Sequence, residues 1–472
     1  DSPTASLRSS QASSERAKKA ATDPSAAEIL SECTVYRTSG GSRRQPRGMD
    51  SDSSPWDDAL TRSADLRRFR LAALKWYDRH GRKLPWRFTA DPYRIWLSEI
   101  MLQQTTVAAV VPYFERFLAA FPTVRELAES DIDRVLRLWE GLGYYSRARN
   151  LHKAANQICR EHNGEFPANA EQLNALPGVG RYTAGAIASF AFNLPAPIVE
   201  ANTERLYARL LGLSVDVKSS AGQKALWSFA GRIVPDTRSG DFNQAMMDLG
   251  ANVCTPQNPR CSECPLSRCC KAFGSGRQGE IPVRKARTPV TEIDEVAIVL
   301  IDRHQVLMRR RTSSERWAGM WDFPRFELTP EDRDLLDKRL LQTPRAGSGK
   351  SKNSTRTKSL FERAEITLPR SILEQTGSLV NVEAGQILAA KQFRYAVTRY
   401  RVTLRAVVCS VDQRTAHGRV DSGSLDTDWF SAQDLDHLPL SQTGRRVADW
   451  VTGLTMQPKY QRSQPENSNE AT

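Results

Sequence analysis

The sequence predicts a multidomain protein in which an all-α domain is followed by an α+β domain. Between residues 63 and 270, apolar side chains recur at helical spacing, most clearly over 93–121. A polar segment rich in Gly and Pro follows at 276–293 and is typical of a linker. Beyond it, short apolar runs at 296–301 and 403–408 are typical of buried strands. Such a change of period indicates a second domain.

Stop and start signals divide the first domain into separate helices. Pro and Gly interrupt the helical pattern at four places, which we interpret as loops: Phe121-Pro122-Thr123, Asn163-Gly164, Leu176-Pro177-Gly178 and Leu194-Pro195. We therefore predict an all-α domain at 63–275, a linker at 276–293 and an α+β domain at 294–455, with a further strand at 305–308.

Both ends of the chain are predicted to be disordered tails, at 1–62 and 456–472. The first 50 residues contain ten serines and one aromatic side chain, Tyr36. Such a segment cannot bury enough apolar surface to fold. Its basic residues alternate with acidic ones, which does not suit a transit peptide.

The charge balance favours a polyanionic partner such as nucleic acid. Lys and Arg number 67 against 54 Asp and Glu, which gives a net charge of +13. No apolar run approaches the roughly 20 residues of a membrane span, and no signal peptide pattern is present. We expect an intracellular protein, in the cytoplasm or nucleoid if it is bacterial.

Five of the eight cysteines lie between residues 254 and 270, and four of them have the spacing C-x6-C-x2-C-x5-C: Cys254, Cys261, Cys264 and Cys270. Disulfides are rare in a reducing compartment, so this clustering indicates a metal site. Four thiolates this close in sequence can ligate one [4Fe–4S] cluster. Zinc is the alternative, because C-x2-C pairs are common zinc ligands. Cys269, next to Cys270, is the spare cysteine and the alternative fourth ligand.

The cysteine spacing resembles the cluster loop of the endonuclease III superfamily of DNA glycosylases, and the resemblance extends from about Leu66 to Cys270. Within that superfamily the chain is most similar to the adenine DNA glycosylase (MutY) family. The segments that carry the similarity are 84–86 (LPW), 96–105 (WLSEIMLQQT), 141–149 (GLGYYSRAR) and 242–250 (FNQAMMDLG).

The resemblance implies a helix-hairpin-helix glycosylase domain with a [4Fe–4S] cluster loop at 254–270. It also implies a base excision repair enzyme that acts as a monomer on double-stranded DNA. Such an enzyme hydrolyses the N-glycosidic bond of adenine mispaired with 8-oxoguanine or guanine.

The segment 176–185 (LPGVGRYTAG) is typical of a hairpin between two helices. Gly178 and Gly180 allow a tight turn, and the free N–H groups of the next helix suit a DNA phosphate. In relatives that also cleave the strand, a lysine nucleophile stands where this chain has Tyr182. Tyrosine cannot form a Schiff base, so the chain resembles the monofunctional branch. Alternatively, Tyr182 is a core aromatic side chain.

Cleavage of a glycosidic bond needs an acid for the leaving base and a carboxylate near the cationic sugar. Glu99 lies in an apolar helical segment, where burial would raise its pKa. By resemblance, Glu99 is the acid that protonates adenine and then the base that activates water. The alternative is a glutamate on the helix surface.

The second carboxylate departs from the family pattern. Glu200-Ala201-Asn202 stands where the family has Asp-Gly-Asn. By resemblance, Glu200 stabilises or attacks the sugar, and Asn202 orients the reacting groups. Glu204, one turn further on, is the fallback. Alternatively, Glu200 only caps the helix, and the enzyme is slow.

Access to a paired base requires that the base be flipped out of the duplex. By resemblance, Gln103 and Gln104 intercalate and form hydrogen bonds, and Tyr144 is a wedge near the opposite base. Arg147 and Arg149 are predicted phosphate contacts. Tyr144 and its neighbour Tyr145 could instead both belong to the core.

The C-terminal domain resembles the Nudix-like (MutT-like) domain that recognises 8-oxoguanine, through the segment 317–324 (WAGMWDFP). It lacks the glutamate-rich Nudix helix, so we expect it to bind and not to hydrolyse. The family's Phe-Ser-His loop aligns with Val397-Thr398-Arg399, and Thr398 offers a hydroxyl to the oxidised base.

Two other functions stay open from the sequence. A thymine or uracil mismatch glycosylase of the same superfamily would share the tyrosine. A catalytically impaired damage-binding protein is the second alternative, and its only support is Glu200 in place of the family's aspartate.

Overall fold

The computed structural model describes residues 63–283, 289–341, 366–411 and 427–455. The predicted tails at 1–62 and 456–472, and residues 284–288 of the predicted linker, lie outside the described residues.

The described chain forms two compact units. The first contains residues 63–103 and 160–283, and the second contains 104–159 together with the described residues from 289 onward. This division cuts through the helical region, because residues 104–159 group with the C-terminal part of the chain. The domain boundaries drawn from the sequence at 275 and 294 stay predictions.

The first unit is helical. Asp91 starts one of its main helices by accepting a hydrogen bond from the Tyr93 N–H, and Gly212 ends another in the left-handed conformation (φ 65°). Its helices are α3 (Ser63–His80), α4 (Pro92–Leu102), α9 (Ala170–Asn174), α10 (Arg181–Phe190), α11 (Ala201–Leu211), α12 (Ser220–Ile233), α13 (Ser239–Asp248) and α14 (Lys271–Gly274), with short turns at Pro85–Arg87, Leu249–Val253, Cys261–Glu263 and Ser267–Cys269.

Aromatic side chains from four helices form the core of the first unit. Phe69 of α3 contacts Phe229 of α12 and Phe242 of α13, with ring centroids 6.5 and 6.3 Å apart. Tyr207 of α11 packs edge-on against Phe229 at 5.4 Å. These contacts bring the first described helix of the chain against helices that follow more than 100 residues later.

The second unit begins with four helices: α5 (Val107–Ala120), α6 (Val124–Glu129), α7 (Ile132–Trp139) and α8 (Ser146–Glu161). The predicted break at Phe121-Pro122-Thr123 is confirmed, because Thr123 and Glu126 form a capping box that starts α6. Phe117, Phe121 and Trp139 pack together as the centre of this group.

The C-terminal domain, residues 289–455, is built on a mixed sheet with the strand order β3-β2-β1-β6-β5. The long neighbours β1 and β6 are parallel, with Val296 opposite Arg405, while β5 and β6 form an antiparallel hairpin. Its described strands are β1 (Thr291–Asp302), β2 (Gln305–Arg310), β3 (Trp321–Asp322), β4 (Arg325–Glu327), β5 (Ala384–Val397), β6 (Tyr400–Val411) and β7 (Thr427–Ser431).

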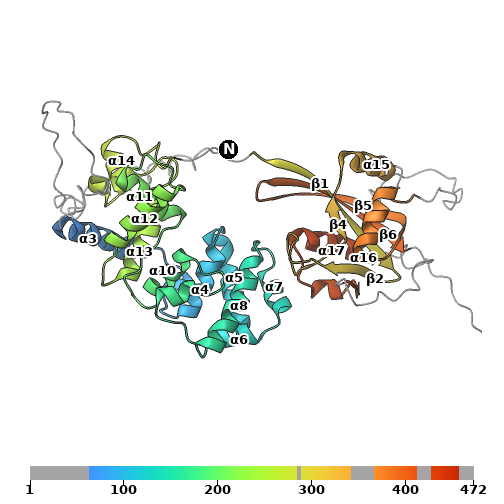
Figure 1. Ribbon diagram of the computed structural model, residues 1–472, viewed down its shortest axis with the longest axis horizontal. Helices are drawn as coiled ribbons and strands as arrows, with labels where there is room; N and C mark the ends of the chain where they lie inside the picture. Colours follow the sequence, from blue (N-terminus) through green and yellow to red (C-terminus); the bar gives the residue numbers. More distant parts are fainter. Residues whose placement is uncertain (1–62, 284–288, 342–365, 412–426, 456–472) are drawn as a thin grey trace, which may run out of the picture. The chain divides into compact units, whose positions relative to one another are not determined.

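Helices cover both faces of this sheet (Figure 1). Ala297 and Val299 share a core with residues of α17 (Gln442–Thr455). Val296 and Ile298, which point the other way, share a core with residues of α15 (Pro330–Leu340) and α16 (Arg370–Val380). The predicted fold class, an all-α domain followed by a domain that mixes strands and helices, is confirmed. Within the described ranges, no helix combines the length and apolar character that crossing a membrane requires.

Candidate active site

Glu99 is a buried carboxyl in the middle of α4. Only 4% of the residue is exposed, and the Tyr182 hydroxyl donates a hydrogen bond to its Oε2 at 2.6 Å. Burial raises the pKa of Glu99 to about 7, against the lowering effects of the Tyr182 hydrogen bond and the Arg87 charge. Glu99 can therefore hold a proton near neutral pH. The surface-helix alternative for Glu99 is wrong.

Tyr182 lies in the first turn of α10, directly after the predicted hairpin. Its hydroxyl contacts Glu99 and lies 3.9 Å from the Met247 sulfur. Burial and the charges of Glu99 and Glu200 raise its pKa well above the usual value. The side chain thus stays a neutral phenol that donates to Glu99, which is more than a packing role.

Glu200 is the N-cap of α11. Its Oε2 accepts the Asn202 N–H and its Oε1 accepts the Thr203 N–H, both at 2.9 Å, and the Thr203 hydroxyl accepts the Glu200 N–H in return. The capping alternative is therefore realised. Burial raises the pKa of Glu200, although the two backbone N–H groups oppose the rise. The catalytic role of Glu200 stays a prediction.

Glu200 and Glu204, the fallback for the second carboxylate, have different hydrogen-bond partners. The side-chain amide of Asn202 donates a hydrogen bond to Glu200 Oε2 at 3.3 Å, and its role in orienting the reacting groups stays a prediction. Glu204 is held by Lys218 at 2.8 Å and by Gln223 at 3.2 Å. The charge of Glu200 raises the pKa of both Glu99 and Tyr182. The assignment of Glu200 as the second carboxylate stays a prediction.

We predicted no role from the sequence for the buried ion pair between Arg87 and Asp248, which lies near Glu99. Arg87 binds Asp248 through two hydrogen bonds of 2.6 and 2.9 Å, and Arg82 binds the same carboxylate through its backbone N–H and Nε. The Arg87 charge lowers the pKa of Glu99. Arg87 directly follows the segment 84–86 and Asp248 lies in the segment 242–250, and both segments carried the family resemblance. Their place in these segments was the sequence signal that could have pointed to the pair.

The hairpin before α10 has the predicted glycine geometry. Gly178 adopts φ 76°, which favours glycine, and exposed Gly180 is the N-cap of α10 without a side-chain cap. The first N–H groups of α10 therefore have no side-chain acceptor from the cap residue. Binding of a DNA phosphate there stays a prediction.

The two predicted glutamines follow the end of α4. Gln103 contacts the Thr183 hydroxyl with its amide nitrogen at 3.4 Å. Gln104 is exposed and has φ 58°, a backbone conformation that costs free energy for a residue other than glycine. An exposed side chain on a strained backbone is typical of a functional position, and the contact of Gln104 with DNA stays a prediction.

The Tyr144 loop, residues 141–145, connects α7 to α8 in the second unit. Gly141, Gly143 and Tyr144 all have positive φ, of 98°, 71° and 49°. Tyr144 is 44% exposed whereas Tyr145 is 4% exposed. The core alternative is therefore wrong for Tyr144 and correct for Tyr145. The loop thus presents an exposed ring on a strained backbone, and the role of Tyr144 as a wedge stays a prediction.

Arg147 supports this loop from inside. It is 8% exposed, and its Nη2 donates to the carbonyls of Leu142 and Gly143, both at 3.1 Å. Its guanidinium also lies over the Tyr144 ring at 5.6 Å. A side chain engaged in this way holds the loop, so the structure does not support the predicted phosphate contact.

Thr398 lies at the tip of the β5–β6 hairpin. It is exposed, adopts φ 53° and donates its hydroxyl to the Val397 carbonyl at 2.7 Å. Its neighbour Arg399 stacks its guanidinium over the Tyr400 ring at 5.0 Å. The hydroxyl is accessible at a turn, and its contact with an oxidised base stays a prediction.

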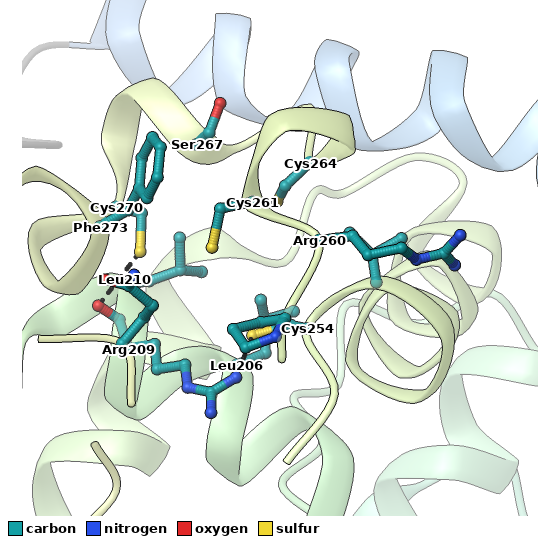
Figure 2. A pocket seen from close by; sticks show the side chains of 13 residues that line it. Leu206, Arg209, Leu210, Cys254, Arg260, Cys261, Cys264, Ser267, Cys270 and Phe273 are labelled. Atoms are coloured by element: carbon teal, nitrogen blue, oxygen red, sulfur yellow. Dashed lines mark hydrogen bonds between the residues drawn. The ribbon is translucent and has the colours of Figure 1, made fainter. Parts of the chain in front are cut away.

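The four predicted cluster ligands line one pocket of about 340 Å³, including open solvent at its mouth. Figure 2 shows the sulfur atoms of Cys254, Cys261 and Cys270 around a common space, and Cys264 also lines it. Cys269 is not among the lining residues. The structure thus brings together the four cysteines predicted as ligands and leaves out the spare one.

Two buried arginines of α11 attach this cysteine loop to the rest of the unit. Arg205 donates to the carbonyls of Gly250 and Cys254 at 2.6 and 2.7 Å. Arg209 donates to the carbonyls of Thr255 and Ile281, and its Nη1 lies 3.3 Å from the Cys254 sulfur. Sequence reasoning missed both, although two arginines four residues apart in an apolar helix were a visible signal.

Two family models match the chain. Residues 97–230 match the HhH-GPD superfamily base excision DNA repair protein model, and residues 296–450 match the NUDIX domain model. The first match contains Glu99, Tyr182 and Glu200, and the second contains Thr398.

Curated relatives match more than half of the chain. The adenine DNA glycosylase of Buchnera aphidicola (subsp. Acyrthosiphon pisum) is 38% identical over 260 residues, which are 55% of this chain and 74% of the relative. The mouse adenine DNA glycosylase is 41% identical over 274 residues, 56% of this chain and 52% of the relative. The human one is 35% identical over 375 residues, 68% of each chain. The chain spans about half of the mouse relative and at least two thirds of the other two, and at these identities it belongs to the adenine DNA glycosylase family.

Proposed function

We propose that this protein is a monofunctional adenine DNA glycosylase of base excision repair that acts on adenine opposite 8-oxoguanine or guanine in duplex DNA. The hydrogen bond between Tyr182 and buried Glu99 carries the proposal. It joins an acid with a pKa near neutrality to a tyrosine that cannot form a Schiff base. Such a DNA substrate places the activity inside the cell.

In the proposed reaction, Glu99 gives its proton to adenine as the bond between the base and C1′ breaks. The bonding electron pair leaves with adenine, and positive charge develops on the sugar. Glu200 stabilises that charge, because its carboxylate is fixed by two backbone N–H groups and needs no reorganisation. Glu99 then accepts a proton from the water that adds to C1′.

The remaining predicted DNA contacts divide into two kinds. Gly178 and Gly180 present backbone N–H groups that would hold a phosphate without reading the sequence. Gln104 and Tyr144 are exposed side chains in strained backbone, which suits insertion into the duplex. Thr398 supplies a hydroxyl for the base opposite adenine. Arg147 is left out of this set because it supports the Tyr144 loop.

We propose that Cys254, Cys261, Cys264 and Cys270 hold a [4Fe–4S] cluster. All four line one pocket, and no other described cysteine lines it. In a cluster each thiolate binds a different iron, so four thiolates around one space suit it. Zinc also takes four thiolates and is the alternative that metal analysis distinguishes.

Replacing Cys264 by Ser should lower iron content and soluble yield together, because metal binding is coupled to folding. Iron and sulfide are to be quantified in anaerobically purified protein, with absorbance near 400 nm as a second readout. Cys269→Ser is the matched control and should keep the full iron content, since Cys269 does not line the pocket. Stoichiometric zinc without iron in the unaltered protein would contradict the cluster.

Base release from four duplexes tests the proposed substrate. With A:8-oxoguanine, A:G, G:T and G:U in separate single-turnover assays, adenine should be released from the first two and no base from the others. The strand should stay intact until alkali is added, because Tyr182 provides no lysine nucleophile. Release of thymine or uracil would support the mismatch glycosylase alternative. Tight binding of A:8-oxoguanine without release would support the impaired damage-binding protein.

A further inference from the structure

Arg445 of the C-terminal domain binds Glu140, the residue directly before the Tyr144 loop. Within the second unit, its Nε and Nη2 donate to the two Glu140 carboxylate oxygens at 2.9 and 3.2 Å. The Arg445 side chain is 15% exposed and that of Glu140 is 11% exposed. A two-point bond between a guanidinium and a carboxylate fixes orientation as well as distance.

Both partners are fixed within their own elements. Arg445, in α17, also donates to the carbonyls of Leu435 and Leu438. Glu140 accepts a hydrogen bond from Arg137 at 2.8 Å, and its carbonyl accepts the Tyr113 hydroxyl at 2.8 Å. The pair is therefore a link between two held groups, unlike an exposed ion pair whose long side chains move freely.

A second contact joins the other end of the loop to the same domain. Arg149, in the first turn of α8, donates to the Ala318 carbonyl at 2.6 Å. Ala318 stands between Trp317 and Gly319, which both have positive φ. The Tyr144 loop is thus bound to the C-terminal domain immediately before and shortly after its strained segment.

We propose that Arg445 is a positioning residue that sets the Tyr144 loop according to the C-terminal domain, and that discrimination of the base opposite adenine depends on this link. A tyrosine with φ 49° keeps its conformation only while its surroundings hold it. Glu140 is the last group before that conformation begins, and it is bound to the domain that carries Thr398. The specificity part of this inference rests on the proposed function, whereas the ordering of the loop does not.

A second ion pair in the same unit provides a matched control. Arg310 of β2 binds Asp133 through two hydrogen bonds of 3.0 and 2.6 Å. It has the same chemistry and joins the same two parts of the chain. Asp133, however, lies in the first turn of α7, at the end remote from the Tyr144 loop. If the ion pairs only dock the C-terminal domain, the two pairs should matter equally.

Three full-length variants test the inference: Arg445→Lys, Glu140→Gln and Arg310→Lys. Lysine keeps the charge but loses the two-point geometry. Hydrogen exchange is to be measured without DNA on peptides that cover residues 141–145. We expect exchange there to be several-fold faster in Arg445→Lys and Glu140→Gln, and unchanged in Arg310→Lys. The double variant of Arg445 and Glu140 should be no worse than either single one, because the two changes remove one interaction.

The second readout is the ratio of single-turnover rates on A:8-oxoguanine and A:G duplexes. The two link variants should lower this ratio by roughly tenfold, a size typical of coupled contacts, and Arg310→Lys should leave it unchanged. Equal effects of all three variants on exchange, or an unaltered ratio, would overturn the inference. If the unaltered protein releases no adenine but the exchange difference is present, the proposed function fails and the positioning of the loop stands.

Discussion

Glu99→Gln should abolish adenine release from an A:8-oxoguanine duplex while duplex binding stays nearly unchanged. Glutamine fills the same space and can still accept the Tyr182 hydrogen bond, but it has no proton to deliver. General acid–base groups contribute typically 10²–10⁴-fold, and Glu99 is proposed to act twice in the reaction. Single-turnover release and a gel-shift titration with the same duplex measure the two effects separately.

The pH profile gives an independent check on Glu99. Because burial raises its pKa to about 7, the acid form persists to neutrality and is lost above it. The single-turnover rate of the unaltered protein should therefore fall as the pH rises above 7. It should also fall on the acid side, where Glu200, whose pKa is raised by burial, takes up a proton and loses the charge that faces the sugar. Glu204→Gln is the control, since Glu204 is bound by Lys218 and should keep the rate. A near-native rate for Glu99→Gln would show that another group is the acid.

Glu200→Gln should lower the single-turnover rate by about two to three orders of magnitude, because it removes the charge that faces the sugar cation. One preorganised group of this kind contributes about 3–4 kcal/mol. The change also weakens the helix cap, since a neutral amide offers one oxygen to the two N–H groups that Glu200 binds. A lost cap costs about 1 kcal/mol of stability. Thermal unfolding must therefore be measured beside the rate.

Glu200→Asp separates catalysis from capping. Aspartate is among the best N-cap residues, so the stability of α11 should be kept. If the active site has adapted to the longer glutamate, the shorter carboxylate should make Glu200→Asp slower than the unaltered protein. A faster Asp variant would mean that the native glutamate is a compromise. Full activity of Glu200→Gln would show that a different carboxylate faces the sugar, and it would exclude the impaired damage-binding alternative.

Local signals in the sequence predicted much of the fold. Phe121-Pro122-Thr123 ended one helix and started another, because a proline and a capping threonine act within a few residues. The apolar run at 296–301 predicted a buried strand, and β1 lies there with a core on each face of the sheet. The cysteine spacing predicted which four cysteines share a pocket. Four residues within one short loop have little freedom to lie far apart.

Contacts between distant residues were not predictable. Arg87 and Asp248 are 161 positions apart, and Arg445 and Glu140 are 305 apart, so no local pattern marks either pair. For the same reason no local pattern indicates that residues 104–159 group with those from 289 onward. Arg147 was assigned a phosphate contact from the family resemblance, whereas the structure shows it buried and bound to the carbonyls of Leu142 and Gly143. Its burial beneath the Tyr144 loop depends on how α7 and α8 meet.

The two arginines of α11 have a consequence for synthesis of the chain. Arg209 is buried, yet its Nε partner, the Ile281 carbonyl, is translated 72 residues after it. Arg205 likewise donates to the carbonyls of Gly250 and Cys254, which are translated 45 and 49 residues after it. A buried guanidinium without acceptors is strongly destabilising. Arg209 gains acceptors at Thr255 and Pro256 before Ile281 is made, so the nascent first unit cannot settle until the cysteine loop has left the ribosome. A premature stop anywhere before that point should therefore yield a product for proteolysis and not a shortened glycosylase.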